Sequence, residues 1–235
     1  MRILLAVSLV ALVICSYAQD GQWKGSVGLS LSVSRATKNS EGLDLIFGAQ
    51  REQGSTKTIV SAAYLFAKQD GATTTDAWFA NADQNFALRD VWYGFVALGL
   101  RNDRINLLDL RTLIGGGLGY RAIRRSDMNL SLEAGATWVK EDFVGAAGTS
   151  TLNGRAGYLF DMALWNGAIL KHDLTFLPKL SDFDDYYSIA RVVIEQELGG
   201  AFTVNLLAIF DYDSTPAPGA KKATSRYILA LGKKF

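Results

Sequence analysis

The sequence predicts an all-β protein: one transmembrane, antiparallel, up-and-down barrel of about twelve strands behind an N-terminal signal peptide. Three observations support this fold class. Apolar and polar residues alternate along most of the chain, an apolar leader precedes them, and the last alternating segment ends on an aromatic residue. A period of two is the pattern of a strand whose two faces meet different surroundings.

The first segment is predicted to be a secretory signal. Arg2 supplies a positive start, residues 3–15 are almost wholly apolar, and small residues lead to Ala18, where a signal peptidase would cleave. We therefore expect residues 1–18 to be removed and residues 19–235 to form a single barrel domain. This signal directs the mature chain across the inner membrane.

The only cysteine, Cys15, lies in the leader, so the mature chain is expected to form no disulfide. A lipoprotein signal at this cysteine is the alternative, but it needs a small residue where Ile14 stands. The mature chain of about 217 residues suits one β domain. Lys+Arg 24 nearly balance Asp+Glu 23, so no strongly basic face indicates nucleic acid as a partner.

Alternating segments follow one another along the mature chain. In the first, Val27, Leu29 and Leu31 share one face, and serines and glycine occupy the other. Two segments, 56–68 and 91–100, alternate poorly, so their registers stay open. The twelve predicted strands cover about residues 23–34, 43–52, 56–68, 76–88, 91–100, 108–121, 129–138, 152–160, 167–177, 187–198, 202–213 and 225–235.

Alternation alone fits two surroundings. In a soluble barrel the apolar face points inward, whereas in a membrane barrel it meets lipid and the polar face lines the lumen. The leader and the even strand number, which brings both termini to one side, favour the membrane barrel. So do aromatic residues near strand ends, where interfacial belts lie: Trp23, Tyr64, Tyr120, Trp138, Tyr158 and Tyr227. A soluble periplasmic binding barrel is the alternative.

The connections are predicted to alternate in length. If both termini are periplasmic, the periplasmic turns are short, around 54–55, 89–90, 124–127 and 199–200, with a somewhat longer one at 162–166. The outer connections are predicted to be longer loops, as in membrane barrels. They cover 35–42, 69–75, 101–107, 140–150, 178–186 and 214–222.

Several strings together resemble the YdiY-like salt-induced outer membrane protein family, and the similarity extends from Trp23 to the closing Phe235. The strings are Leu113–Arg121, Leu132–Gly135, Leu177–Tyr186 and Asp211–Gly219. Two positions depart from the family pattern: residues 35–39 replace a Gly-Asn turn, and Lys233 replaces an aromatic residue. The resemblance implies an outer-membrane barrel linked to salt or osmotic stress. The family has no established biochemical activity, so it implies no catalytic residues.

The last strand is similar to the C-terminal assembly signal of outer-membrane barrels. One face of the strand is mostly apolar and aromatic, with Tyr227, Leu229, Leu231 and Phe235, and the chain ends on that face. We expect these residues to be recognised by the barrel assembly machinery. The further expected partners are outer-membrane lipid and lipopolysaccharide.

Charges of both signs lie on the polar faces. An Arg or Lys facing lipid at the midplane costs about 2–4 kcal/mol, so these residues are predicted to face the lumen. Two interpretations stay open: a largely filled lumen of ion pairs, or a narrow porin-like channel for small polar solutes or ions. The predicted lumen residues are Asp109, Arg111, Arg121, Glu133, Arg155, Lys171, Asp173, Arg191, Glu195, Asp211 and Arg226.

An acidic run on the predicted outer side could hold a hard divalent cation and so bridge lipopolysaccharide phosphates. Its members are Asp182, Asp184 and Asp185, with Asp213 from the next outer connection. The alternative is a solvated loop whose carboxylates cap turns. No other metal site and no cofactor is predicted.

An enzyme active at the barrel rim is the alternative from a different functional class. The chain has one histidine, His172, between Lys171 and Asp173, and no serine in a Gly-x-Ser-x-Gly context. A lone histidine cannot share a metal with a second one. We therefore expect a non-enzymatic protein of the bacterial outer membrane, with a role in envelope integrity under osmotic stress.

Overall fold

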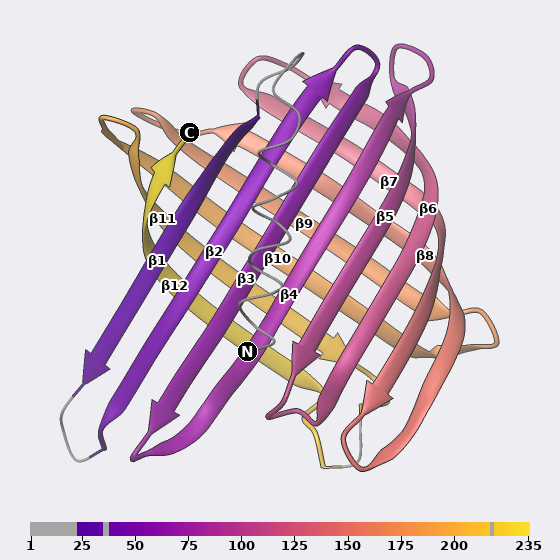
Figure 1. Ribbon diagram of the computed structural model, residues 1–235. Helices are drawn as coiled ribbons and strands as arrows, with labels where there is room; N and C mark the ends of the chain where they lie inside the picture. Colours follow the sequence, from indigo (N-terminus) through magenta and orange to yellow (C-terminus); the bar gives the residue numbers. More distant parts are fainter. Residues whose placement is uncertain (1–22, 35–37, 217–218) are drawn as a thin grey trace.

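The computed structural model describes residues 23–34, 38–216 and 219–235, so the predicted leader lies outside the described residues. These residues form a closed barrel of twelve antiparallel strands (Figure 1). They contain no helix long and apolar enough to cross a membrane. The strands are β1 (Lys24–Ser34), β2 (Ser40–Gln53), β3 (Thr56–Gln69), β4 (Ala72–Ala87), β5 (Trp92–Asp103), β6 (Leu108–Arg124), β7 (Met128–Phe143), β8 (Ala146–Ala163), β9 (Ala168–Lys179), β10 (Asp182–Gly199), β11 (Phe202–Asp213) and β12 (Ala223–Lys234).

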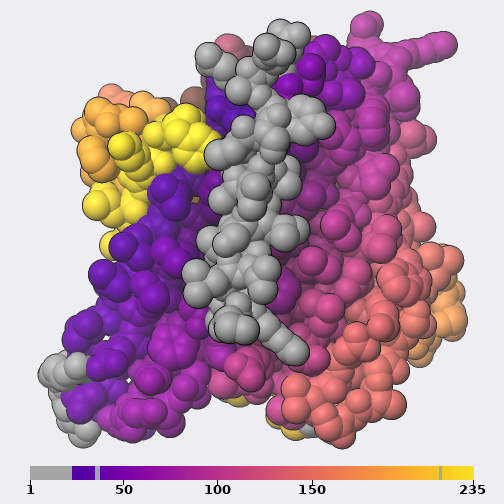
Figure 2. Space-filling view, viewed as in Figure 1, coloured from indigo at the N-terminus to yellow at the C-terminus, as the bar shows by residue number. Residues whose placement is uncertain are grey.

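Each strand pairs with its neighbours in sequence, and β12 returns to β1, as the sequence predicts for an up-and-down barrel. The even strand number places the start of β1 and the end of β12 at the same end, which we call the terminal end. The opposite end, which includes the turns 70–71 and 180–181, is the distal end. In Figure 2 the strands form adjacent inclined bands across the visible wall.

The predicted difference between short and long connections is confirmed only in part. The turns at the terminal end are short, and the distal connection 214–222 has its predicted bounds. The distal connections 70–71, 144–145 and 180–181 contradict the prediction, because they have only two residues each, the same length as 54–55 and 200–201 at the terminal end. The polar segments that suggested loops remain paired as strands. Asp70 and Gly71 show why so short a turn forms: both have positive φ, 50° and 81°, and such a turn matches the twist of the strands it joins.

The outward face is apolar where the alternation is clean. In β12, Tyr227 and Leu229 are 69% and 64% exposed, whereas Ile228 and Ala230, which alternate with them, are 4% and 1% exposed. In β1, Leu31 and Val33 are likewise exposed. A closed barrel leaves one side of each strand facing out, so this apolar outer surface is the one that a lipid phase would cover.

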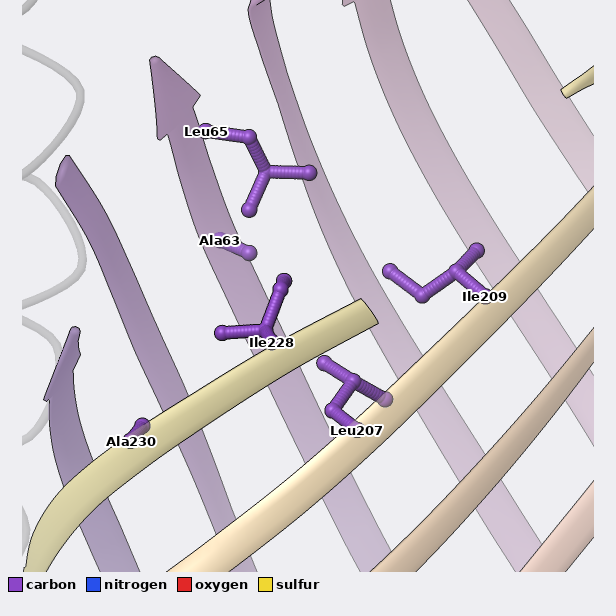
Figure 3. Packing of buried hydrophobic residues seen from close by; sticks show 6 residues of the cluster. All are labelled: Ala63, Leu65, Leu207, Ile209, Ile228 and Ala230. Carbon is purple, nitrogen blue, oxygen red and sulfur yellow. The ribbon is translucent and has the colours of Figure 1, made fainter. Parts of the chain in front are cut away.

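The inward face is not polar throughout, contrary to the simple form of the prediction. Six inward residues of β3, β11 and β12 form an apolar cluster: Ala63, Leu65, Leu207, Ile209, Ile228 and Ala230. In Figure 3, β11 and β12 cross steeply over β3, and side chains from the two sides approach one another. Strand β3 alternates poorly in the sequence because both of its faces are apolar.

Closure between β1 and β12 is much shorter than the other pairings. Only four residue pairs join them, from Ser26 with Lys234 to Leu29 with Leu231. By contrast, β1 and β2 share eleven pairs. The last residue reinforces the closure, because the backbone N–H groups of Gly25 and Phe235 each donate to the other's carbonyl, at 3.1 and 3.0 Å. Beyond these pairs the two strands diverge (Figure 1).

Candidate functional site: a charged belt across the lumen

Charged side chains from opposite walls meet inside the barrel toward its distal end. Asp211 of β11 accepts hydrogen bonds from Arg101 of β5, the second of them from Nη2 at 2.8 Å. Arg226 of β12 donates to Asp103 of β5 at 2.5 Å and to Asp211 at 3.3 Å. Tyr187 of β10 donates its hydroxyl hydrogen to Asp211 and accepts from Arg101, both at 2.8 Å. We call these five residues the belt.

Arg111 of β6 lies beside the belt and extends the charged contacts along the neighbouring wall. Its Nε donates to Glu141 of β7 at 2.6 Å, and its Nη2 lies 2.5 Å from an oxygen of Asp213. Its guanidinium stacks over the ring of Tyr187, 4.1 Å from the centroid. Because β5 and β6 pair Arg101 directly with Arg111, two like charges are adjacent, and each is neutralised by its own carboxylates.

Burial makes these contacts necessary. The side chains of Asp103 and Asp211 are 4% and 8% exposed, and that of Arg101 is 13% exposed. Charges removed from water cost several kcal/mol each unless opposite charges and hydrogen bonds compensate them. The two-point contact between guanidinium and carboxylate in Arg101–Asp211 is the strong form of this compensation. The belt is therefore an ordered tie between the β5 wall and the β10–β12 wall.

A second set of charges lies nearer the terminal end. Arg155 of β8 lies 3.2 Å from Glu133 of β7, and Arg191 of β10 lies 2.9 Å from Asp173 of β9. We call these two contacts the inner pairs. The hydroxyl of Tyr93 also donates to Glu133, at 3.0 Å.

Tyr93 can reach Glu133 because Gly119 leaves room for its ring. A Cβ atom at Gly119 would lie 2.1 Å from that ring. Arg121 adds its guanidinium over the same ring, 5.2 Å from the centroid. The position of the Tyr93 ring thus depends on a glycine at the paired position of the adjacent strand, β6.

The terminal rim carries a third set of charges. Lys234 lies 2.7 Å from Glu195 and 2.6 Å from Glu197, and Lys171 lies 4.0 Å from Glu195. Lys171 is half-exposed, so its contact is the weakest of the three. This set lies beside the closure of β1 with β12, whereas the belt lies toward the distal end.

Two cavities lie on either side of the belt. The smaller, of about 50 Å³, opens among Asp213, Pro216 and Lys222, and we call it the vestibule. The larger, of about 110 Å³, is bounded by Arg226, Arg155 and Arg191, and we call it the chamber. Arg101 and Tyr187 line both cavities. The belt is therefore the partition between the vestibule and the chamber.

The structure brings most of the predicted lumen residues into these sets. Asp109 is the exception: it lies exposed at a β-bulge between Leu108 and Leu110, where the extra residue shifts the register. Those in contact with opposite charges or aromatic rings are Arg111, Arg121, Glu133, Arg155, Lys171, Asp173, Arg191, Glu195, Asp211 and Arg226.

The acidic residues of the predicted cation site do not converge. Asp185 accepts from Lys179 at 3.0 Å and from Thr215 at 2.5 Å, and Asp213 pairs with Arg111. Asp182 accepts from the backbone N–H of Asp184, as in a capped turn. Within the ranges that the structure describes, no group of three or more such side chains is placed to hold a metal ion.

His172 lies on the outer surface of the barrel, away from the belt. Its Nδ1 is 3.0 Å from the hydroxyl of Tyr158, and the two rings meet edge to face. It is paired in the sheet with Phe160 and Val192. Its side-chain partner on the described strands is thus a tyrosine.

The predicted assembly-signal residues occupy the outer face of β12 and the chain end. Tyr227, Leu229, Leu231 and Phe235 are all more than half exposed. The ring of Phe235 stacks with that of Phe47 on β2, 6.2 Å between centroids. The last aromatic residue therefore reaches over β1, the strand that completes the barrel.

Sequence reasoning missed four residues of the site: Arg101, Asp103, Glu141 and Tyr187. The first two follow the long apolar run of β5 and fall in a predicted outer loop, as does Glu141. The one signal for Arg101 and Asp103 is alternation that continues past the apolar run, from Gly99 through Arg101 to Asp103. Tyr187 falls in a predicted strand, but nothing in its own segment indicates its partners.

Comparison with known proteins places the chain in a family. A family described as "Protein of unknown function, DUF481" matches residues 27–235. The chain belongs to the DUF481 family. Membership in an uncharacterised family agrees with the resemblance found in the sequence. No curated protein matches the chain at a significant level.

Solved structures share the fold of this DUF481 protein. The translocator domain of autotransporter NalP from Neisseria meningitidis has a TM-score of 0.50 and 12% identity, covering 98% of this chain and 93% of that one. The NanC porin has a TM-score of 0.51 and 11% identity, covering 91% and 99%. At such identities the likeness concerns the fold alone, which is that of an outer-membrane barrel.

Proposed function

We propose that this DUF481 protein is a non-enzymatic outer-membrane barrel whose lumen is closed at rest, and that it supports the envelope under osmotic or salt stress. The belt carries the proposal. It joins β5 to β10, β11 and β12 through buried bonds. The same contacts would stiffen the barrel and obstruct its lumen. The apolar cluster reinforces it from the same walls.

The outer surface supports a location in the outer membrane. Leu31, Val33 and Tyr227 are exposed on this surface, and contact between such apolar side chains and water is unfavourable. Lipid and lipopolysaccharide would cover this surface, and the exposed face of β12 would be read by the assembly machinery. Fractionation of cells checks the location: the protein should stay with outer membrane after a wash in plain buffer. Release of a folded monomer by that wash would overturn it.

Conductance tests the closed lumen. We expect the purified wild type to be silent in planar bilayers at moderate voltage, and the double variant Arg101→Ala/Asp211→Ala to give steady open currents. The matched control is Arg125→Ala/Asp127→Ala, which removes an exposed ion pair at the terminal end. It should stay silent. Steady current through the wild type would contradict the closed lumen.

A narrow porin-like channel is the second candidate, and one observation favours it. The vestibule and the chamber share two lining residues, Arg101 and Tyr187, and both belong to the belt. A change in the rotamers of Arg101 and Tyr187 would join them. In that case the wild type would conduct in brief openings, and the double variant would lengthen them.

The proposed role in stress is tested in cells. A strain lacking the gene should lyse more readily than its parent after transfer from high to low salt, and the wild-type gene should restore resistance. The Arg101→Ala/Asp211→Ala variant should restore it less well, because an open lumen admits solutes. Equal survival of all strains would remove the stress role while leaving the barrel and its closure untouched.

A further inference from the structure

The ladder between β1 and β12 stops near the middle of β1. Within the described residues, its last pair is Leu29 with Leu231. Strand β1 nevertheless continues toward the distal end, paired with β2 on its other side, and the facing part of β12 stays paired with β11. The two strands therefore diverge from Leu29 and Leu231 onward and leave a gap in the wall (Figure 1).

The side chains along this gap are more exposed than those of the continuous wall. Leu31 of β1 is 72% exposed, whereas Leu118 and Leu206, on strands paired on both sides, are 53% and 45% exposed. Ser32 is exposed too, although the alternation places it on the inner face. A neighbouring strand would cover part of each of these side chains, so their exposure agrees with the missing pairs.

The backbone at the gap lacks the partners that a membrane requires. Gly25 and Phe235 exchange two hydrogen bonds, so in the same register Leu31 and Val33 would also be residues that exchange bonds with β12. Their side chains lie on the apolar outer surface, which places this part of β1 in the proposed membrane. Inside the bilayer no water replaces missing backbone bonds, so an open edge is strongly unfavourable there.

The existing register can be extended into the gap without a slip. Outer side chains would then lie beside outer ones, and inner side chains beside inner ones, as a continuous sheet requires. The additional pairs would be Ser30 with Ala230, Leu31 with Leu229, Ser32 with Ile228 and Val33 with Tyr227.

Contacts inside the barrel hold the distal part of β12 away from β1. Ile228 belongs to the apolar cluster with Leu65 of β3, and Arg226 bonds to Asp103 of β5. In a continuous sheet, β1 and β2 would separate β12 from β3 by three strand spacings of about 4.8 Å each. Pairing with β1 and packing against β3 therefore compete for the same part of β12 (Figure 3).

We propose that the distal half of the β1–β12 joint is a lateral gate in the barrel wall. The gate is open in this structure, where the apolar cluster and Arg226 hold β12 inward. It closes in a bilayer when the four additional pairs form in the existing register. The gate rests on the proposed membrane location, but it requires neither the closed lumen nor the role in stress.

Disulfide formation in liposomes tests the closed state. Residues 19–235 contain no cysteine, so Leu31→Cys/Leu229→Cys introduces a single reporter pair. We expect this pair to cross-link with a lipid-soluble oxidant. Val27→Cys/Lys233→Cys, already paired in the structure, is the positive control. Val33→Cys/Leu231→Cys, out of register, should stay unlinked. Failure of the reporter pair to link while the positive control links would overturn the gate.

Weakening the apolar cluster tests the competition. Ile228→Ala, added to the reporter pair, should raise the rate of cross-linking about threefold or more, because truncation removes packing that favours the open state. Val139→Ala, at a buried position outside the apolar cluster, should leave the rate unchanged. An unchanged rate in folded Ile228→Ala would contradict the competition. Ile228→Val, a milder truncation, decides if Ile228→Ala does not fold.

Spin labels provide a measurement that needs no change in the apolar cluster. Labels on Val33→Cys/Tyr227→Cys should give two separate distances in liposomes, a short one for the closed gate and a longer one for the open gate. A single distance would contradict two states. The wash in plain buffer tests the membrane location by itself. An unlinked reporter pair in protein that stays with the membrane therefore counts against the gate alone.

Discussion

The belt and the apolar cluster both join opposite walls of one barrel, but they do so by different forces. The belt depends on directed contacts, such as Arg226 with Asp103 at 2.5 Å, between side chains that are charged and buried. The apolar cluster joins β3 to β11 and β12 through side chains such as Leu65 and Ile209, which have no preferred bonding direction.

The belt and the apolar cluster should respond differently when one of their side chains is truncated. Removing one member of a buried ion pair leaves an uncompensated charge, so the loss exceeds the value of the bond itself. Removing part of an apolar side chain leaves a cavity whose cost depends on how far the neighbours relax. Truncating one belt residue should therefore disrupt the whole belt, whereas truncations in the apolar cluster should lower stability in proportion to the volume removed.

The largest effect is expected for Asp211→Ala. This change leaves Arg101 and Arg226 without their shared carboxylate, so stability should fall by about 3–5 kcal/mol. Conductance should appear at the same time, because the partition is broken. Denaturant unfolding in detergent micelles and single-channel recording measure the two effects, with the exposed Asp127→Ala as control. Unchanged stability would show that the belt is not the strong tie.

Leu65→Ala should come next. Leu65 is 2% exposed, and truncating such a side chain costs about 2–5 kcal/mol. The belt remains complete, so the barrel should stay silent in bilayers despite its lower stability. The same unfolding and recording measurements apply, and Leu31→Ala on the outer surface is the matched control. Open currents through Leu65→Ala would show that the apolar cluster, not the belt, closes the lumen.

Tyr187→Phe is a milder change to the belt. It removes a hydroxyl that donates to Asp211 and accepts from Arg101, while the two charged groups keep their direct contact, so the loss should be near the lower end of the about 1.5–3 kcal/mol that a hydrogen bond to a charged group contributes. The ion pairs persist, so we expect a modest loss of stability and brief openings rather than steady current. Tyr212→Phe, at a ring that stacks on Tyr186 outside the belt, is the control.

Lys179→Met gives the smallest effect, at the distal rim near turn 180–181. Partial burial alone would raise the pKa of Asp185, but hydrogen bonds from Thr215 and Lys179 together hold it below its usual value. A carboxyl group whose pKa is lower in the folded than in the unfolded chain stabilises the folded protein at pH values above the unfolded pKa. This contribution is lost as the pH falls through the folded pKa. Lys179→Met should raise the pKa of Asp185 in a carbon-13 NMR titration. Lys140→Met, at a different hairpin, should leave it unchanged.

The barrel itself could be predicted from the sequence, because a strand between two unlike surroundings must alternate. Segment 225–235 shows this pattern clearly, with Tyr227, Leu229, Leu231 and Phe235 on the outer face. Prediction was poorest for β3 and β5. There, inward positions such as Leu65 and Phe95 are as apolar as the outward ones, so the period of two is lost.

The pairing of charges could not be predicted. Arg226 and Asp103 are 123 residues apart, and Arg101 and Asp211 are 110 apart. Which residues face one another across a barrel depends on the stagger between strands, which no single segment encodes. Bulges add local shifts, as at Asp109, where one extra residue turned a predicted lumen charge outward.

The short pairing of β1 with β12 determines where the barrel opens locally. Only four residue pairs and the contacts of Phe235 hold this joint, while every neighbouring joint has more. Local opening begins where fewest backbone bonds must break together. Deuterium should therefore reach the amides of β1 and β12 along this joint before those of β6 and β7, and the cylinder should unroll from here.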